Sequence, residues 1–114
     1  MNLVLPYPPS SNRYWRHFRG RTVISAEARA YRLLVASLCA SHGITPLVGD
    51  VSFEASVYRP QKRGDLDNRL KIILDALQGH AFSDDKQITA IRLSRHDDKA
   101  NPRVEVTIEA ARAK

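Results

Sequence analysis

With 114 residues, the chain is long enough for one domain over residues 1–114 that buries about two-thirds of its unfolded surface, and too short for a second domain of ordinary size. Its one cysteine, Cys39, excludes an internal disulfide, and its place in an apolar helical run indicates a buried thiol in a reducing compartment. Eighteen Lys and Arg against twelve Asp and Glu give a formal net charge of +6, which favours a polyanion, and nucleic acid first, as the partner.

The N-terminal segment NLVLPYPP predicts a short strand that ends at Pro6, because proline removes a hydrogen-bond donor from the ladder. The start of the chain has neither a positive leader nor a long apolar run, and no stretch reaches the roughly 18 apolar residues of a membrane span. We therefore expect a cytoplasmic protein without a membrane partner.

The next stretch, SSNRYWRHFRGRTVIS, is basic and aromatic, and Gly20 predicts the turn of a hairpin. Its arginines alternate with Tyr14, Trp15 and Phe18, a combination that binds backbone phosphates and stacks on exposed bases. In the ordinary interpretation, the aromatic side chains belong to the core and the arginines are simply solvated. The nucleic-acid contacts that we predict are Asn12, Arg13, Tyr14, Trp15, Arg16, Arg19 and Arg21, together with Lys62 and Arg63 of a later connector.

The sequence after Ser25 predicts a helix over residues 26–42, ended by Gly43. The helical spacing comes from Ala30, Leu33, Leu34 and Leu38, with Tyr31. Residues 51–60 then alternate apolar and polar side chains, the pattern of a half-buried strand. The alternating apolar residues are Val51, Phe53, Ala55 and Val57.

After the polar connector QKRGDLDN, leucines and isoleucines repeat every three to four residues and predict a second helix over residues 67–78, before Gly79. The stretches QITAIRLSRH and RVEVTIEA each alternate like strands, and the polar DDKANP separates them. The order β-α-β-α-β-β predicts an α/β (α+β) fold, a small mixed sheet of about four strands with two helices.

Two aspartates, Asp65 and Asp67, stand directly before the second helical repeat. On an extended segment that enters a helix, carboxylates two residues apart can point the same way. Their ordinary interpretation is helix capping, because Asp and Asn are favoured at that position and acids suit the macrodipole of the first turn. A single helix N-cap requires only one acidic residue, however. This stretch has two, with Asn68 beside them, and a second pair, Asp84 and Asp85, follows the next turn.

Carboxylates that converge repel one another unless a cation lies between them. If Asp84 or Asp85 returns to the first pair, the oxygen ligands suit Mg²⁺, or Mn²⁺ in its place, with water and a substrate phosphate completing the shell. Such a site activates water for phosphodiester hydrolysis. Lys71, one helical turn beyond Asp67, would stabilise the charge that develops on the phosphate; its ordinary interpretation is a surface ion pair with Asp67 or Asp75.

Other chemistries have no support in the sequence. The four histidines lack zinc-site spacing and there is no second cysteine. Walker A, GxGxxG and nucleophile motifs are also absent. Nucleotide-driven chemistry and acyl transfer are therefore not expected.

In matching order, the segments PYPPSSNRYWR, RGRTVIS, GDLDNRLKIILDAL and FSDDKQI resemble the RusA-type Holliday-junction resolvases, small endonucleases of bacteria and their prophages. The likeness spans nearly the whole chain, and the blocks DLDN...K...DAL and DD.Q are its most specific parts. One position, Gly64, departs from the pattern, because a basic residue is expected before the first acid.

The resemblance implies a Mg²⁺-dependent homodimer with a RusA-like fold that cuts four-way junction DNA by paired nicks, in DNA recombination and repair. Carried over residue by residue, the essential acids and metal ligands are Asp65, Asp67 and Asp85, and the catalytic lysine is Lys71. Asn68 and Asp84 adjoin them and are assigned weaker roles near the metal. The DNA-contacting N-terminal segment corresponds to residues 12–21.

Two other functions stay open at this point. The chain is a non-catalytic branched or single-stranded DNA-binding protein if the acids are caps and the aromatic residues are stacking platforms. It is a metal-dependent ribonuclease if the same metal chemistry acts on RNA. A dependence of activity on metal distinguishes a nuclease from the non-catalytic DNA-binding protein. Matched RNA and DNA substrates distinguish a deoxyribonuclease from the ribonuclease.

Overall fold

The computed structural model describes residues 1–9, 15–18, 21–60 and 66–111, and of residues 15–18, 21–24 and 66–68 it describes the backbone alone. Its main feature is a four-stranded mixed sheet in the order β1-β6-β4-β5. Strands β4 and β5 run parallel, and the other neighbours run antiparallel. The strands are β1 (Asn2–Pro6), β4 (Val51–Arg59), β5 (Ile88–Asp97) and β6 (Arg103–Ala110). This arrangement confirms the predicted α+β class and its sheet.

The inner strand β4 forms the centre of the core. Its apolar residues Val51, Phe53, Ala55 and Val57 are all buried, as their alternation predicted. Because paired residues of neighbouring strands point to the same face, Val104, Val106 and Ile108 of β6 and Leu3 and Leu5 of β1 complete the same apolar layer. The edge strand β5 is mostly exposed and adds little to this layer.

Helix α2 (Ala26–Ser41) begins where the sequence predicted, because the Ser25 hydroxyl accepts a hydrogen bond from the Ala28 N–H at 3.2 Å. Gly43, with φ of +65°, follows its end. The buried side of α2 consists of Ala28, Tyr31, Val35 and Cys39, so the prediction of a buried thiol is confirmed. Burial raises the pKa of Cys39, which keeps the thiol protonated at neutral pH.

Only some of the apolar residues whose spacing predicted α2 are buried in the structure. Leu33 and Leu34 point outward, with 72% and 53% of their surface exposed. The helix therefore carries one apolar face toward the sheet and a second one toward solvent.

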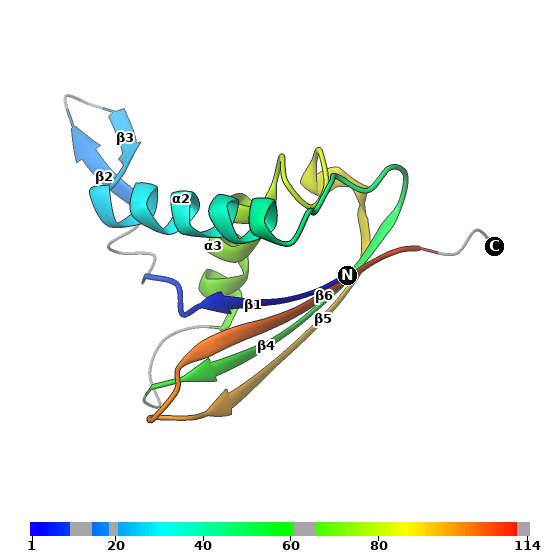
Figure 1. Ribbon diagram of the computed structural model, residues 1–114. Helices are drawn as coiled ribbons and strands as arrows, with labels where there is room; N and C mark the ends of the chain where they lie inside the picture. Colours follow the sequence, from blue (N-terminus) through cyan, green and yellow to red (C-terminus); the bar gives the residue numbers. More distant parts are fainter. Residues whose placement is uncertain (10–14, 19–20, 61–65, 112–114) are drawn as a thin grey trace.

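Helix α3 (Leu66–Leu77) connects the parallel strands β4 and β5, and its Ile72, Ile73, Ala76 and Leu77 are buried. Both helices lie on the same face of the sheet and leave the other face uncovered (Figure 1). Helix α2 contacts β1 and α3 contacts β5, so that the two helices together cover the sheet from edge to edge. Among the described helices, none is long and apolar enough to cross a membrane.

The uncovered face of the sheet is polar and internally paired. The Tyr58 ring stacks on His96 at 4.7 Å between centroids, and the Arg103 guanidinium lies 3.8 Å from the same ring. Arg103 also binds the carboxylates of Glu105 and Asp98, at 2.8 and 2.9 Å, and these two partners raise its pKa. The charge of Arg103 is thus neutralised by neighbouring carboxylates.

The predicted hairpin is confirmed. Strands β2 (Trp15–Phe18) and β3 (Arg21–Ile24) pair antiparallel in a separate two-stranded sheet, with Phe18 opposite Arg21 across the turn. The hairpin projects from the body of the molecule beyond the N-terminal end of α2 (Figure 1).

Candidate active site

The first predicted group of site residues lies at the start of α3. Asp65 is outside the described residues, while Asp67 and Asn68 belong to the first turn of the helix. Lys71 follows one turn later and is exposed to solvent. A lysine at i+4 from Asp67 lies on the same side of the helix, so the backbone places Asp67 and Lys71 as the sequence predicted.

The start of α3 is anchored to the segment after β1. Arg69 donates from Nη1 to the Pro8 carbonyl at 3.2 Å, and its guanidinium lies 5.0 Å from the centre of the Tyr7 ring. The Tyr31 hydroxyl of α2 donates to the Pro6 carbonyl at 2.8 Å, so the same segment also contacts the first half of α2. Tyr7 and Arg69 were not predicted from the sequence, although an arginine next to the DLDN block was a visible signal.

The second acidic pair lies in a short turn between α3 and β5. Asp84 caps the 3₁₀ turn η1 (Asp85–Gln87) and accepts a hydrogen bond from the Lys86 N–H at 2.9 Å. That bond, followed by a hydrogen bond with the Asp85 side chain, holds the pKa of Asp84 below its usual value. Asp84 therefore has a structural role in the turn, whereas the Asp85 carboxyl, which is exposed, is open to a ligand.

Gln87 holds this turn in place. Its side-chain oxygen accepts from the N–H groups of Ser83 and Asp84, at 2.9 and 3.0 Å. Its side-chain nitrogen donates to the carbonyls of Leu47 and Gly49, both at 2.8 Å. This role of Gln87 was not predicted from the sequence, although a glutamine three residues after an aspartate cap is the signature of a capping box.

Replacing Gln87 with alanine should lower the free energy of unfolding by about 1–3 kcal/mol, because two loop carbonyls and two N–H groups lose their partner. Urea denaturation followed by circular dichroism measures the change. Gln78→Ala is the matched control, since Gln78 is exposed and accepts one long bond, 3.4 Å from the Asp85 N–H. Equal losses in the two variants would contradict the bracing role of Gln87.

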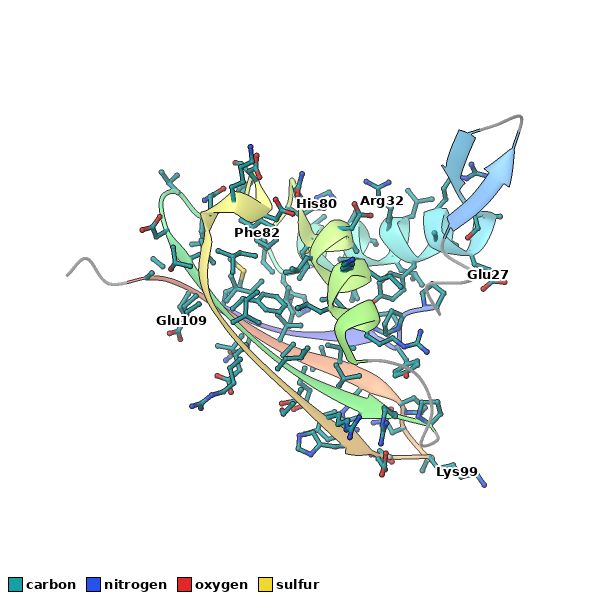
Figure 2. All side chains as sticks on the ribbon, turned by 180° about the vertical axis from the view of Figure 1, so that it is seen from behind. Glu27, Arg32, His80, Phe82, Lys99 and Glu109 are labelled. Carbon is teal, nitrogen blue, oxygen red and sulfur yellow. The ribbon has the colours of Figure 1, made fainter. Side chains whose placement is uncertain are left out.

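The two acidic groups lie at opposite ends of α3. From Asp67 to Leu77 the helix axis extends about 15 Å, at 1.5 Å per residue. The Asp85 N–H contacts the side chain of Gln78, the residue directly after the helix. Figure 2 shows His80 and Phe82, which connect α3 to the turn, beyond that same end of the helix. A single chain therefore does not bring Asp85 beside Asp67, contrary to the expectation that the second pair returns to the first.

Four other acids of the described part of the chain, Asp75, Asp97, Asp98 and Glu105, are engaged in ion pairs. Asp75, expected to pair with Lys71, has Arg32 of α2 at 3.5 Å. Asp97 pairs with Arg59 at 2.8 Å, at the ends of the parallel strands β5 and β4. Among the described residues no group of three or more His, Cys, Asp or Glu is arranged to hold a metal ion. A metal site within the described part of one chain would thus be incomplete.

The predicted nucleic-acid contacts are only partly located. Trp15 and Arg16 lie in β2 and Arg21 in β3, where the structure gives the backbone of the hairpin. Six others lie outside the described residues: Asn12, Arg13, Tyr14, Arg19, Lys62 and Arg63.

Known proteins resemble this chain over most of its length. Residues 6–109 match the family model described as endodeoxyribonuclease RusA. The chain belongs to the RusA family of endodeoxyribonucleases. It is 39% identical over 110 residues to the crossover junction endodeoxyribonuclease RusA of Escherichia coli strain K12, and 40% identical to that of Enterobacteria phage 82. The aligned region covers 94% of this chain and 92% of each relative.

Membership of the RusA family confirms the resemblance that the sequence motifs indicated. The matched region includes both acidic groups, Lys71 and the hairpin, and it leaves only the two ends of the chain unmatched. As a member of this family, the chain is an endodeoxyribonuclease, an enzyme that cuts phosphodiester bonds in DNA.

Proposed function

We propose that this RusA-family enzyme, with residues 1–114 acting as one domain, resolves Holliday junctions. It cuts four-way DNA by paired symmetric nicks during recombination and repair in the bacterial or phage-infected cytoplasm. The observation that carries the proposal is the near full-length similarity to relatives named crossover junction endodeoxyribonucleases. The two acidic groups and Lys71 supply chemistry that suits this reaction.

The donor set suits Mg²⁺, with Mn²⁺ as a substitute. Asp65, Asp67 and Asp85 offer carboxylate oxygens, the hard ligands that these ions prefer. When bound, the ion supplies charge neutralisation at the scissile phosphate and a water of lowered pKa. Asn68 and Asp84 stand next to these ligands; Asp84 orders the turn that presents Asp85.

The separation of the acids supports a site shared between two chains. Because α3 keeps Asp67 and Asp85 about one helix length apart, we assign Asp65 and Asp67 of one subunit to a site that also uses Asp85 of the partner subunit. A C₂ homodimer then contains two such sites. Two equivalent sites match the two-fold symmetry of a four-way junction, as paired nicking requires.

The remaining residues act on the DNA backbone. Lys71, exposed one turn from Asp67, stabilises the negative charge that grows on the phosphate as the bond breaks. The hairpin, with Arg13, Arg16, Arg19 and Arg21 in and around it, binds phosphates of the junction arms, and Tyr14 and Trp15 stack on exposed bases. Asn12, Lys62 and Arg63 extend this contact.

The test is cleavage of a labelled four-way DNA junction in Mg²⁺, beside a linear duplex of the same sequence and the matching RNA junction. We expect symmetric nicks in the DNA junction alone, and none with EDTA at constant ionic strength or with Asp67→Asn. Binding without nicking would favour the non-catalytic DNA-binding alternative, and preferred cutting of RNA would favour the ribonuclease.

A further inference from the structure

Arg95 lies on the side of the edge strand β5 that faces the helices. The register pairs Arg95 with Val57 and Leu93 with Ala55, and both partners in β4 are fully buried. Because paired residues of neighbouring strands point to the same face, Leu93 and Arg95 both face the helical layer. Leu93 packs against the core, whereas Arg95 is exposed. The apolar row on this face of β5 therefore ends in a charged side chain.

This end of β5 is also the end of the sheet at which α3 begins. Helix α3 follows β4 in the chain, and β5 then runs in the same direction as β4. The helix therefore runs opposite to both strands, and its first turn lies at their carboxyl ends (Figures 1 and 2). Arg95 stands two residues before Asp97, where β5 ends. Arg95 and the first turn of α3, which contains Asp67, thus lie at the same end of the sheet.

The flank of α3 that carries position 67 is the one beside β5. On the other flank, Asp75 pairs with Arg32 of α2 at 3.5 Å, so that flank faces α2. Helical periodicity puts Leu70 and Leu74 on the opposite flank, where they are partly buried and where α3 contacts β5. Asp67 precedes Leu74 by about two helical turns, at 3.6 residues per turn, and so shares its flank. Position 67 therefore lies on the side of the helix that meets β5.

The charge of Arg95 is not neutralised by the acid nearest to it on its own strand. Asp97 shares its face of β5, but Oδ1 of Asp97 already accepts from Nε and Nη2 of Arg59, at 3.1 and 2.8 Å. Arg103, at the same end of the sheet, is likewise bound to carboxylates. No ion pair joins Arg95 to another of the described side chains. Its guanidinium is thus available to an anion, and its planar set of N–H donors matches a phosphate.

We propose that Arg95 binds a phosphate of the DNA strand being cut, next to the phosphate at which cleavage occurs. The proposal rests on the proposed function, in which Asp67 and Lys71 act at the cleaved bond. Around the axis of α3, position 67 falls between Lys71 and the flank that meets β5. A strand that crosses position 67 therefore has Lys71 on one side and Arg95 on the other. Two cations that hold neighbouring phosphates fix which bond lies at the acids.

Junction binding by Arg95→Gln in Ca²⁺, measured over a series of salt concentrations, tests the contact. We expect the affinity to fall roughly tenfold, the effect of one charge-assisted hydrogen-bonded contact. The slope of log affinity against log salt should decrease in magnitude by about 0.9, because one phosphate fewer is neutralised. Arg95→Lys should recover the slope, since it keeps the charge, but only part of the affinity. Arg95 is exposed, so the melting temperature should not change.

Arg92→Gln is the matched control, because Arg92 is an exposed arginine of the same strand that lies opposite Glu54, on the uncovered face of the sheet. It should bind with the affinity and the salt slope of the wild type. If Arg95→Gln does the same, Arg95 serves only to keep other strands from pairing with the sheet edge, and the inference is overturned.

The position of the contacted phosphate is tested with junctions that carry one neutral methylphosphonate on the cut strand. Neutralising the phosphate next to the cleavage site should weaken binding by the wild type and have no further effect on Arg95→Gln, because the contact is already lost. The same loss in both proteins would contradict the assignment. These measurements concern binding alone: a wild-type protein that binds the junction with the expected salt slope but does not nick it would refute the proposed function and not the phosphate contact.

Discussion

Co-expression of the Asp67→Asn and Asp85→Asn chains should restore junction nicking that neither variant has as a homodimer. If each site takes Asp67 from one subunit and Asp85 from the other, the mixed dimer concentrates both substitutions in one site and leaves the second site intact. Random pairing makes half of the dimers mixed, so about a quarter of the wild-type number of sites should return. Differently tagged chains and tandem purification isolate the mixed dimer for the assay.

The products provide an independent check. A mixed dimer with one intact site should nick one strand of each junction and should not release the paired products of the wild-type enzyme. A chain that carries both substitutions, paired with a wild-type chain, is the control, because each of its two sites retains one substitution and no nicking should remain. If the mixed dimer of single variants is inactive, the two acids act within one chain and the shared site is wrong.

Replacing Lys71 with alanine should lower the rate constant for nicking by about 10²–10³-fold, the usual loss when a group that stabilises transition-state charge is removed. Junction affinity should change little, because one exposed lysine contributes a small part of a binding energy spread over many phosphates. Single-turnover cleavage and a binding titration in Ca²⁺ separate the two quantities.

Lys99→Ala is the matched control for Lys71, since Lys99 is an exposed lysine in the turn between β5 and β6, at one end of the sheet (Figure 2). Its cleavage rate should equal that of the wild type. If Lys71 served only as a surface ion-pair partner, its removal would change stability by a few tenths of a kcal/mol and leave the rate constant unchanged.

Local patterns predicted the elements well where one physical signal dominated. The alternation along β4 gave both the strand and its buried face, because a two-residue period leaves one choice of side. Ser25 and Gly43 gave the ends of α2 through capping chemistry. The face of α2 was ambiguous, because apolar residues occur on both sides and the sequence does not say which side meets the sheet.

The distance between the two acidic groups could not be predicted from local sequence patterns, for a different reason. Asp67 and Asp85 are separated by a full helix, and whether a turn folds back along a helix or stays at its end depends on long-range contacts. Here Gln78, Gln87 and the Leu47 backbone hold the turn at the far end. The sequence contains the right residues, but the distance between them depends on tertiary structure.

The uncovered face of the sheet makes the two sides of the molecule chemically different. A polyanion that approaches from that side meets Glu54, Glu105 and Glu109 beside Arg92 and Arg103, and Arg103 is already bound to carboxylates. The three acids leave little net positive charge on the bare strands, so we expect a nucleic acid to reach the protein from the helical side, where the hairpin also projects (Figure 1). Each subunit of the proposed homodimer would then present its arginine hairpin to the junction from its own helical side.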